Sequence, residues 1–286
     1  MWLGLLLLLA AHPLAAQHII YTKEATPTMT EYAQMCYDAY YSYNNSHFEW
    51  IPNHDLIPIG WENQSIRGYV FVSDTEANVV FKGTSLEFIG IGQDTSAQDK
   101  TADNLLFSYC CGQLWPLTPV CHCETCATTS PCFQDYVLNQ SVNYYLQGLD
   151  IYHQMKAQLP TKRFKLLGHS LGGGLATILG AKLVLPVVTF GCPGTQHFLD
   201  LMGIVLHNEH EHIHIGNTQD PIFKGTCGWW CYIAGYVIQT RCRRGIECII
   251  QSGDGNSLLK HVITEYLEDV KKADTWSCSL VTTCVE

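Results

Sequence analysis

Apolar and polar positions alternate along this chain with two different periods, which predicts an alternation of strands and helices. Five short apolar runs have the length and composition of buried strands. They are residues 67–73, 78–82, 163–167, 186–191 and 210–215. Four longer segments repeat apolar side chains at helical spacing. They are residues 30–43, 141–158, 171–183 and 257–271. This order predicts a mainly parallel sheet with helices on both faces.

A glycine-rich turn follows the third predicted strand. Gly168-His169-Ser170-Leu171-Gly172 has the form G-x-S-x-G, and an Ala- and Leu-rich helix follows it. In α/β-hydrolases this turn lifts a nucleophilic serine between a strand and a helix. Glycines in the motif remove side chains that would clash in so sharp a turn. We therefore predict an α/β-hydrolase fold with Ser170 as nucleophile, against the alternative of a glycine-rich turn without chemistry.

The serine needs a base and an acid from elsewhere in the chain. A histidine must accept the hydroxyl proton, and a carboxylate must orient that histidine. In this fold the order is serine, acid, histidine. His261 is the only histidine after the cluster at residues 207–214, so it is the predicted base. Asp220 ends a predicted strand and precedes a proline, so it is the predicted acid, with Asp200 and Glu247 as alternatives.

Acyl transfer also requires donors for the oxyanion. One is expected from the backbone N–H of Leu171, directly after the nucleophile. The second is expected from Thr84, in a glycine-containing loop after the strand at residues 78–82. Thr84 has both an amide and a hydroxyl to offer, and the alternative is an ordinary glycine turn.

The polar segment that follows this loop contains a small apolar patch. The patch is Phe88, Ile89 and Ile91. We predict these residues as part of a mobile lid, and the alternative is a surface loop with an apolar underside. A cysteine-rich insert comes next, with six cysteines within residues 110–132.

Four segments of the chain are similar to a known family. They are the motifs Phe-Lys-Gly-Thr-Ser at 81–85, Asp-Asn-Leu-Leu-Phe-Ser-x-Cys-Cys at 103–111, Gly-His-Ser-Leu-Gly-Gly at 168–173 and Asp-Pro-Ile-Phe-x-Gly-Thr-Cys at 220–227. They occur in the same order as in the class 3 lipases. From about residue 68 to 267 the chain resembles, more narrowly, the fungal vacuolar autophagic lipases.

This resemblance implies hydrolysis of acyl esters in phospholipid or triacylglycerol, delivered by the secretory route to a vacuole or lysosome-like lumen. It implies that Ser170, Asp220 and His261 match the family's triad positions. No cofactor is expected, and the expected partner is lipid at a membrane or droplet surface, with no protein partner to infer. The alternatives are an esterase acting on soluble or carbohydrate-linked esters and a secreted binding protein on a catalytically inactive scaffold.

The N-terminal residues predict entry into the secretory pathway. Residues 2–11 are an unbroken apolar run, and small residues precede Gln17. Because a bilayer-spanning helix needs about 20 apolar residues, we expect residues 1–16 to be a cleaved signal peptide rather than an uncleaved anchor. Residues 17–286 are then expected to form one domain.

Cysteines and glycosylation motifs agree with that route. The chain has 14 cysteines, which predicts up to seven disulfides formed in an oxidising compartment, either extracellular or luminal. Three Asn-x-Ser motifs begin at Asn44, Asn63 and Asn139.

Charge argues against one class of partner. The net charge of −10 is opposite to the basic surface that nucleic-acid binding requires.

Three histidines have the spacing of a possible zinc site, because His210, His212 and His214 would share one face of a strand. No acidic residue or cysteine completes an obvious ligand set, and we therefore predict no metal.

Overall fold

The computed structural model describes residues 18–21, 26–62, 65–85, 95–109, 131–273 and 276–284. Several predictions fall outside these residues. They are the signal peptide at 1–16, the lid residues Phe88, Ile89 and Ile91, the glycosylation motif at Asn63 and most of the cysteine-rich insert.

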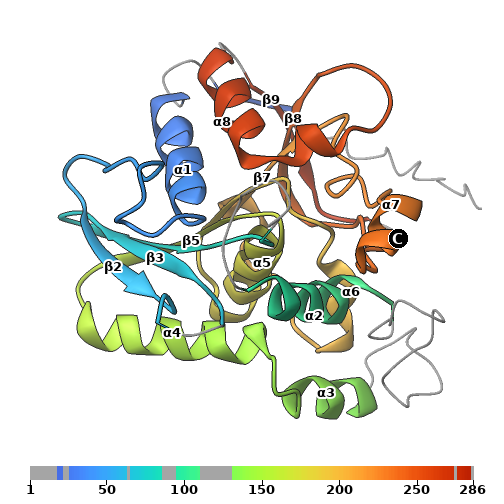
Figure 1. The fold of residues 1–286 in the computed structure, drawn as a ribbon, viewed down its shortest axis with the longest axis horizontal. Helices are drawn as coiled ribbons and strands as arrows, with labels where there is room; N and C mark the ends of the chain where they lie inside the picture. The colour runs from blue at the N-terminus through green and yellow to red at the C-terminus, as the bar shows by residue number, and fades with distance from the viewer. Residues whose placement is uncertain are drawn as a thin grey trace, which may run out of the picture.

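One mixed sheet forms the centre of the molecule (Figure 1). Its strands are β1 (His18–Tyr21), β2 (Asp55–Ile59), β3 (Gly68–Val72), β4 (Glu76–Phe81), β5 (Arg163–His169), β6 (Val187–Phe190), β7 (His212–Asn217), β8 (Gly245–Ile250) and β9 (Trp276–Val281). Their order is β1-β9-β8-β7-β6-β5-β4-β3-β2. Strands β4 to β8 are parallel, and antiparallel strands extend the sheet at both edges. The predicted parallel sheet is thus its centre.

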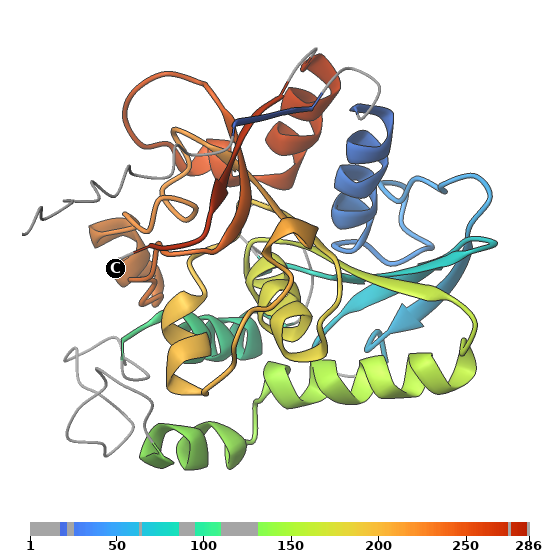
Figure 2. The same cartoon turned by 180° about the vertical axis from the view of Figure 1, so that it is seen from behind.

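Helices cover both faces of the sheet. They are α1 (Thr26–Asp38), α2 (Ser96–Phe107), α3 (Pro131–Leu138), α4 (Tyr144–Gln158), α5 (Leu171–Leu183), α6 (Gln196–Leu201), α7 (Trp229–Ala234) and α8 (Ile263–Lys272), with short 3₁₀ turns η3 (Glu209–Glu211) and η4 (Leu258–His261). In Figure 1, α1 and α8 lie on the upper side and α4 on the lower side, and Figure 2 shows the same layers from behind.

Alternation along the central strands divides the core in two. Val79 of β4 and Leu166 of β5 pack with α2, α4 and α5, while Val80 and Leu167 pack with α1 and α8. Successive side chains of a strand point to opposite faces, so each strand supplies both cores. The predicted α/β-hydrolase architecture, with helices on both faces, is confirmed.

Two predicted helices differ from the observed ones in where they begin or break. The helix predicted at 30–43 is α1, which begins at Thr26 because the proline at position 27 is compatible with a first helical turn. The helix predicted at 257–271 is broken at Val262, which has extended backbone with φ −71° and ψ 138°. The break separates η4, which ends at His261, from α8.

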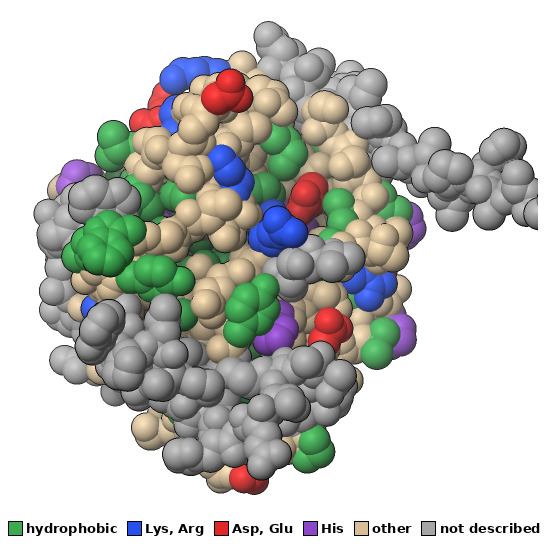
Figure 3. Space-filling view, turned by 90° about the vertical axis from the view of Figure 1, so that its right-hand side faces the viewer, with side chains coloured by type: hydrophobic (Ala, Val, Ile, Leu, Met, Phe, Trp, Pro, Cys, Tyr) green, Lys and Arg blue, Asp and Glu red, His purple; other side chains and the backbone are tan. Residues whose placement is uncertain are grey.

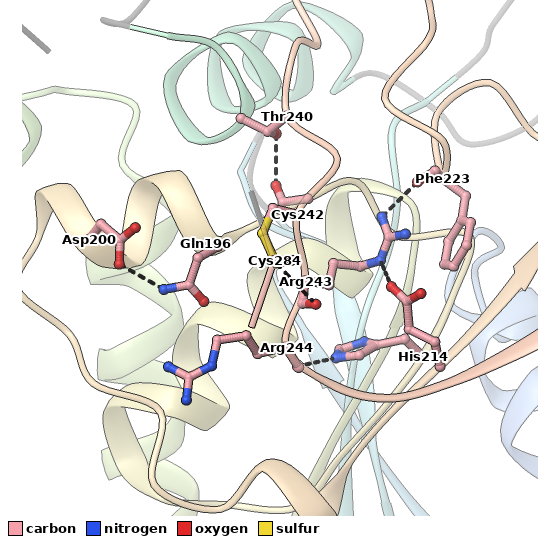
Figure 4. Close-up of a disulfide and its surroundings, with 11 residues drawn as sticks. Gln196, Asp200, His214, Phe223, Thr240, Cys242, Arg243, Arg244 and Cys284 are labelled. Atoms are coloured by element: carbon pink, nitrogen blue, oxygen red, sulfur yellow. Dashed lines mark hydrogen bonds and ion pairs between the residues drawn. A yellow bond between two sulfur atoms is a disulfide. The ribbon is translucent and has the colours of Figure 1, made fainter. Parts of the chain in front are cut away.

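Two unpaired cysteines lower the predicted upper limit of seven disulfides to six. Cys36 in α1 and Cys192 after β6 are free thiols, both fully buried in the protein interior. Twelve cysteines then remain for at most six disulfides. Three of these join described residues: Cys227–Cys231, Cys242–Cys284 (Figure 4) and the cross-strand pair Cys248–Cys278. They hold the C-terminal part of the fold together.

None of the helices within the described ranges has the length and apolar character needed to cross a bilayer.

Candidate active site

Ser170 occupies a strained turn between β5 and α5. Its backbone has φ 56° and ψ −127°, an uncommon conformation for a residue with a side chain. The neighbouring positions must be glycine, because a side chain at either of them would clash with nearby backbone. A Cβ at Gly168 would lie 2.3 Å from the backbone of Gly172, and a Cβ at Gly172 would lie 2.1 Å from the carbonyl oxygen of Phe81. Only glycine therefore lets the turn sit this close to β4.

The structure brings the three predicted triad residues together. His261 Nε2 lies 2.8 Å from Ser170 Oγ, and His261 Nδ1 lies 2.8 Å from Asp220 Oδ2. Because a carboxylate accepts hydrogen bonds, Nδ1 carries the proton and Nε2 is left to accept from the serine hydroxyl. The Asp220 side chain is completely buried, while that of His261 is 10% exposed. The three side chains therefore form one continuous chain of hydrogen bonds.

Asp220 is held by more groups than sequence reasoning identified. The hydroxyl of Tyr266, on α8, donates to the same Oδ2 at 2.7 Å. The N–H groups of Ile222 and Phe223 donate to Oδ1 at 2.8 and 3.2 Å. Burial by itself would raise the pKa of Asp220, but its electrostatic interaction with His261 and the hydrogen bonds from His261, Tyr266 and Phe223 outweigh it and keep the pKa below its ordinary value. The carboxylate is therefore ionised beside His261.

The two alternative acids have other partners. Asp200 lies in α6 and accepts a hydrogen bond from Gln196 at 2.7 Å. Glu247 lies in β8 and forms an ion pair with Arg243 at 3.0 Å. Figure 4 shows the hydrogen bond between Gln196 and Asp200 near the disulfide of the C-terminal region. Only Asp220 of the three is hydrogen-bonded to His261.

The loop after β4 runs beside the nucleophile. A Cβ at Gly83 would lie 3.1 Å from the Cβ of Ser170, which measures how close this backbone comes. The Thr84 hydroxyl donates to Asp103 Oδ2 at 2.7 Å, so the backbone N–H is the group left for an oxyanion. Burial raises the pKa of Asp103 to about 8. Leu171 is the first residue of α5, where N–H groups have no acceptor within the helix.

His169 is a further residue that sequence reasoning missed as part of the site. Its Nε2 lies 2.7 Å from the carbonyl oxygen of His261 and therefore donates to it. Its Nδ1 accepts from the Tyr40 hydroxyl at 2.6 Å. Burial, reinforced by the neighbouring His261, lowers the pKa of His169 to about 3. His169 thus stays neutral and ties the backbone of His261 to the turn that follows α1.

The histidines of β7 are part of the core. His212 and His214 are both fully buried. Across the part of the chain that the structure describes, no three His, Cys, Asp or Glu side chains form a group able to hold a metal ion.

The strand–serine–helix turn on a sheet with a parallel centre, followed along the chain by Asp220 and then His261, defines an α/β-hydrolase fold. The chain is 39% identical over 248 residues to a protein of Lodderomyces elongisporus named "Putative lipase ATG15", covering 77% of this chain and 44% of that protein. It is 36% identical over 258 residues to a protein of the same name from Scheffersomyces stipitis, covering 80% and 40%. These homologues confirm the resemblance found in the sequence, and the chain belongs with the ATG15 proteins among the class 3 lipases.

Two further comparisons define the extent of this similarity. The structure of a lipase from Rhizopus microsporus var. chinensis aligns with a TM-score of 0.50 at 18% identity, covering 94% of this chain and 84% of that one. This likeness shows the fold. No family model matches the chain. The chain spans less than half the length of the curated relatives it matches.

Proposed function

We propose that this chain hydrolyses carboxylic ester bonds in lipids through Ser170. The observation that carries the proposal is the unbroken hydrogen-bond path from Ser170 Oγ through His261 to Asp220, with two links of 2.8 Å each. The names of its relatives as lipases support the same chemistry.

In the first half of the reaction, Ser170 Oγ attacks the ester carbonyl carbon while His261 Nε2 takes its proton. Asp220 balances the charge of the imidazolium and holds the ring orientation. The carbonyl oxygen becomes an oxyanion, which accepts hydrogen bonds from the N–H groups of Thr84 and Leu171. His261 then gives its proton to the leaving alcohol, and the acyl group remains on Ser170.

In the second half, water attacks the acyl-enzyme, with the same base and the same two donors. Proton transfer from water to His261 generates the nucleophile, and collapse of the second intermediate releases a fatty acid and restores the serine hydroxyl. No step needs a metal or an organic cofactor.

Exposed apolar side chains support a lipid substrate over a soluble ester. Leu258 and Leu259, just before His261, are 49% and 73% exposed. Trp229 and Ile233, on α7, are 72% and 59% exposed. Figure 3 shows the face that carries α7, where several hydrophobic side chains reach the surface. Exposed apolar groups of this kind favour contact with a lipid aggregate.

We further propose that the protein acts in the secretory route, in a vacuole or lysosome-like lumen, on phospholipid or triacylglycerol of internalised membranes. Disulfides such as Cys248–Cys278 require an oxidising compartment. Asn44 and Asn139 are exposed, so both glycosylation motifs are accessible.

The test compares wild type with Ser170→Ala on phospholipid vesicles, emulsified triglyceride and a soluble short-chain ester. We expect the variant to lose roughly 10⁴-fold or more of kcat, because it lacks the nucleophile. Ser73→Ala is the matched control, since it removes a hydroxyl at the opposite end of β4. Equal rates for Ser170→Ala and wild type would exclude the mechanism. Wild-type turnover confined to the soluble ester would exclude the lipid substrate.

A further inference from the structure

A buried lysine lies directly under the loop that carries Thr84. Lys82 follows β4 and is only 4% exposed. Its Nζ donates to the carbonyl oxygen of Gly83 at 2.7 Å, to Ser85 Oγ at 2.8 Å and to Asp99 Oδ2 at 2.8 Å. An ammonium group has three donors, and all three are used. The lysine is therefore fixed in place, and two of its three acceptors belong to the loop itself.

The counter-charge is fixed as firmly. Asp99, on α2, is 1% exposed, and its Oδ2 also accepts from the N–H of Ser85 at 2.9 Å and the Thr95 hydroxyl at 2.8 Å. Its Oδ1 accepts from the Tyr144 hydroxyl at 2.8 Å. Burying two charges costs as much desolvation energy as their attraction returns, so such a pair is a poor source of stability. Stability therefore does not explain why this buried ion pair, with all its hydrogen bonds made, is present.

The hydrogen bond to Gly83 has a geometric consequence. The Gly83 carbonyl and the Thr84 N–H belong to one planar trans peptide, so they point in opposite directions. Holding the carbonyl oxygen on the ammonium therefore fixes the direction of the N–H. This peptide lies against the nucleophile, because a Cβ at Gly83 would be 3.1 Å from Ser170 Cβ and 2.6 Å from the carbonyl oxygen of His169.

We propose that Lys82 is a positioning residue, which through the Gly83 carbonyl aims the Thr84 N–H at the oxyanion, with Asp99 as its fixed counter-ion. The inference rests on the proposed function, because the direction of this N–H matters only if an oxyanion forms at Ser170. A cation on the carbonyl also polarises the peptide group, which strengthens the N–H as a donor. Lys82 itself touches no substrate.

The test removes the charge pair as a unit, in the double variant Lys82→Met with Asp99→Leu. Replacing a buried ion pair by apolar residues of similar size is often neutral or stabilising, so this variant avoids the unpaired charge that either single change leaves. We expect kcat on a soluble ester to fall about 10- to 100-fold, less than or similar to the loss of a whole oxyanion donor, with KM within about twofold. Affinity for a straight-chain alkylboronic acid should fall by the same factor, because a boronate oxygen occupies the oxyanion position.

A matched control separates positioning from stability. Tyr144→Phe removes a hydrogen bond to Asp99 but leaves the contact between Lys82 and Gly83. We expect a lower Tm for this variant, with kcat and boronate affinity unchanged. The single variant Lys82→Met is measured in parallel, and far-ultraviolet circular dichroism establishes which variants are folded.

Three results are distinguishable. If Ser170→Ala retains wild-type turnover, the proposed function fails. If Ser170→Ala is inactive while the folded double variant keeps wild-type kcat and boronate affinity, the positioning role of Lys82 is overturned and the function stands. If neither Lys82 variant folds, the positioning role is also overturned, because a device that only aims a loop is dispensable for folding.

Discussion

Two hydroxyl–imidazole pairs lie in this fold with the same spacing and different surroundings. Ser170 Oγ lies 2.8 Å from His261 Nε2 above β5, and Thr189 Oγ1 lies 2.8 Å from His214 Nδ1 between β6 and β7. The hydrogen bonds alone do not distinguish them. What separates a candidate nucleophile from a core contact is therefore found in the groups around each pair.

The first difference is the partner of the second ring nitrogen. His261 donates to the carboxylate of Asp220, whereas His214 Nε2 lies 3.1 Å from the backbone carbonyl of Arg244. A carboxylate stabilises an imidazolium far more than a neutral carbonyl does. Burial, with the charges of His212 and Arg243, lowers the pKa of His214 well below its ordinary value. His214 is therefore a poor proton acceptor.

The two pairs also differ in their exposure to solvent and in their backbone conformation. Ser170 and His261 are 7% and 8% exposed, while Thr189 and His214 are completely buried. Thr189 lies within regular β6, whereas Ser170 lies in the positive-φ turn beside the N–H of Leu171. A hydroxyl bonded to a histidine thus becomes a candidate nucleophile only when a carboxylate, solvent access and nearby oxyanion donors accompany it.

The largest effect is expected when the first pair is made to resemble the second, by removing the carboxylate charge beside its histidine. Asp220→Asn keeps the size of the acid but removes its charge, and we expect kcat to fall roughly 10³- to 10⁴-fold. Turnover of a soluble ester at pH 8 gives the measurement. Asp200→Asn is the control, because Asp200 lies in α6 with another partner and should leave kcat within twofold. Comparable losses in both variants would mean that Asp220 has no special role.

The sequence led to Ser170, Asp220 and His261 because each choice depended on local or ordered features. The glycines of the turn and the order of acid and base are visible in one dimension. Tyr266 and the pair of Lys82 with Asp99 were missed because their contacts join segments that no local pattern connects. Tyr266 meets the Asp220 loop across 46 residues.

The sheet edges and the free thiols were missed for related reasons. β2 carries Pro58 at a register position opposite Tyr69, and a proline normally argues against a strand except at an edge. Cys36 and Cys192 were counted toward disulfides, although each fills the interior as a small apolar side chain. Cysteine number therefore sets only an upper limit on the number of disulfides.

A smaller effect tests whether the histidines of β7 are core residues, as the comparison requires. His212 is fully buried, and burial lowers its pKa to about 4, opposed only in part by a backbone contact with Leu185. In the unfolded chain a histidine pKa is about 6.5. Below that pH the unfolded state therefore binds a proton that the folded state refuses, and wild type loses stability as pH falls toward 4.

The substitution His212→Leu removes the loss of stability that this histidine causes at low pH. We expect the free energy of unfolding of the variant, relative to wild type, to rise by about 3 kcal/mol between pH 7 and pH 4, from the shift in this one pKa. Urea unfolding at several pH values measures the difference. His210→Leu, at an exposed position two residues earlier, controls for loss of an imidazole as such. Parallel stability curves for His212→Leu and wild type would mean that the buried histidine takes up its proton in the folded state.

The smallest effect is expected from the second pair itself. Thr189→Val keeps the shape of the side chain but removes the hydroxyl that bonds His214. Leaving a buried imidazole nitrogen without its donor should cost about 1 to 3 kcal/mol of stability, measured by urea unfolding at pH 7. Turnover should stay within twofold of wild type, because Thr189 and His214 are completely buried and make no hydrogen bond to Ser170, His261 or Asp220. A tenfold loss of kcat would instead show that the two pairs are coupled. Cys192 connects them, because its Sγ lies 3.1 Å from Thr189 Oγ1 and its Cβ lies 2.9 Å from the position of a Cβ at Gly173. Gly173 is in the first turn of α5, the helix that carries the Leu171 N–H.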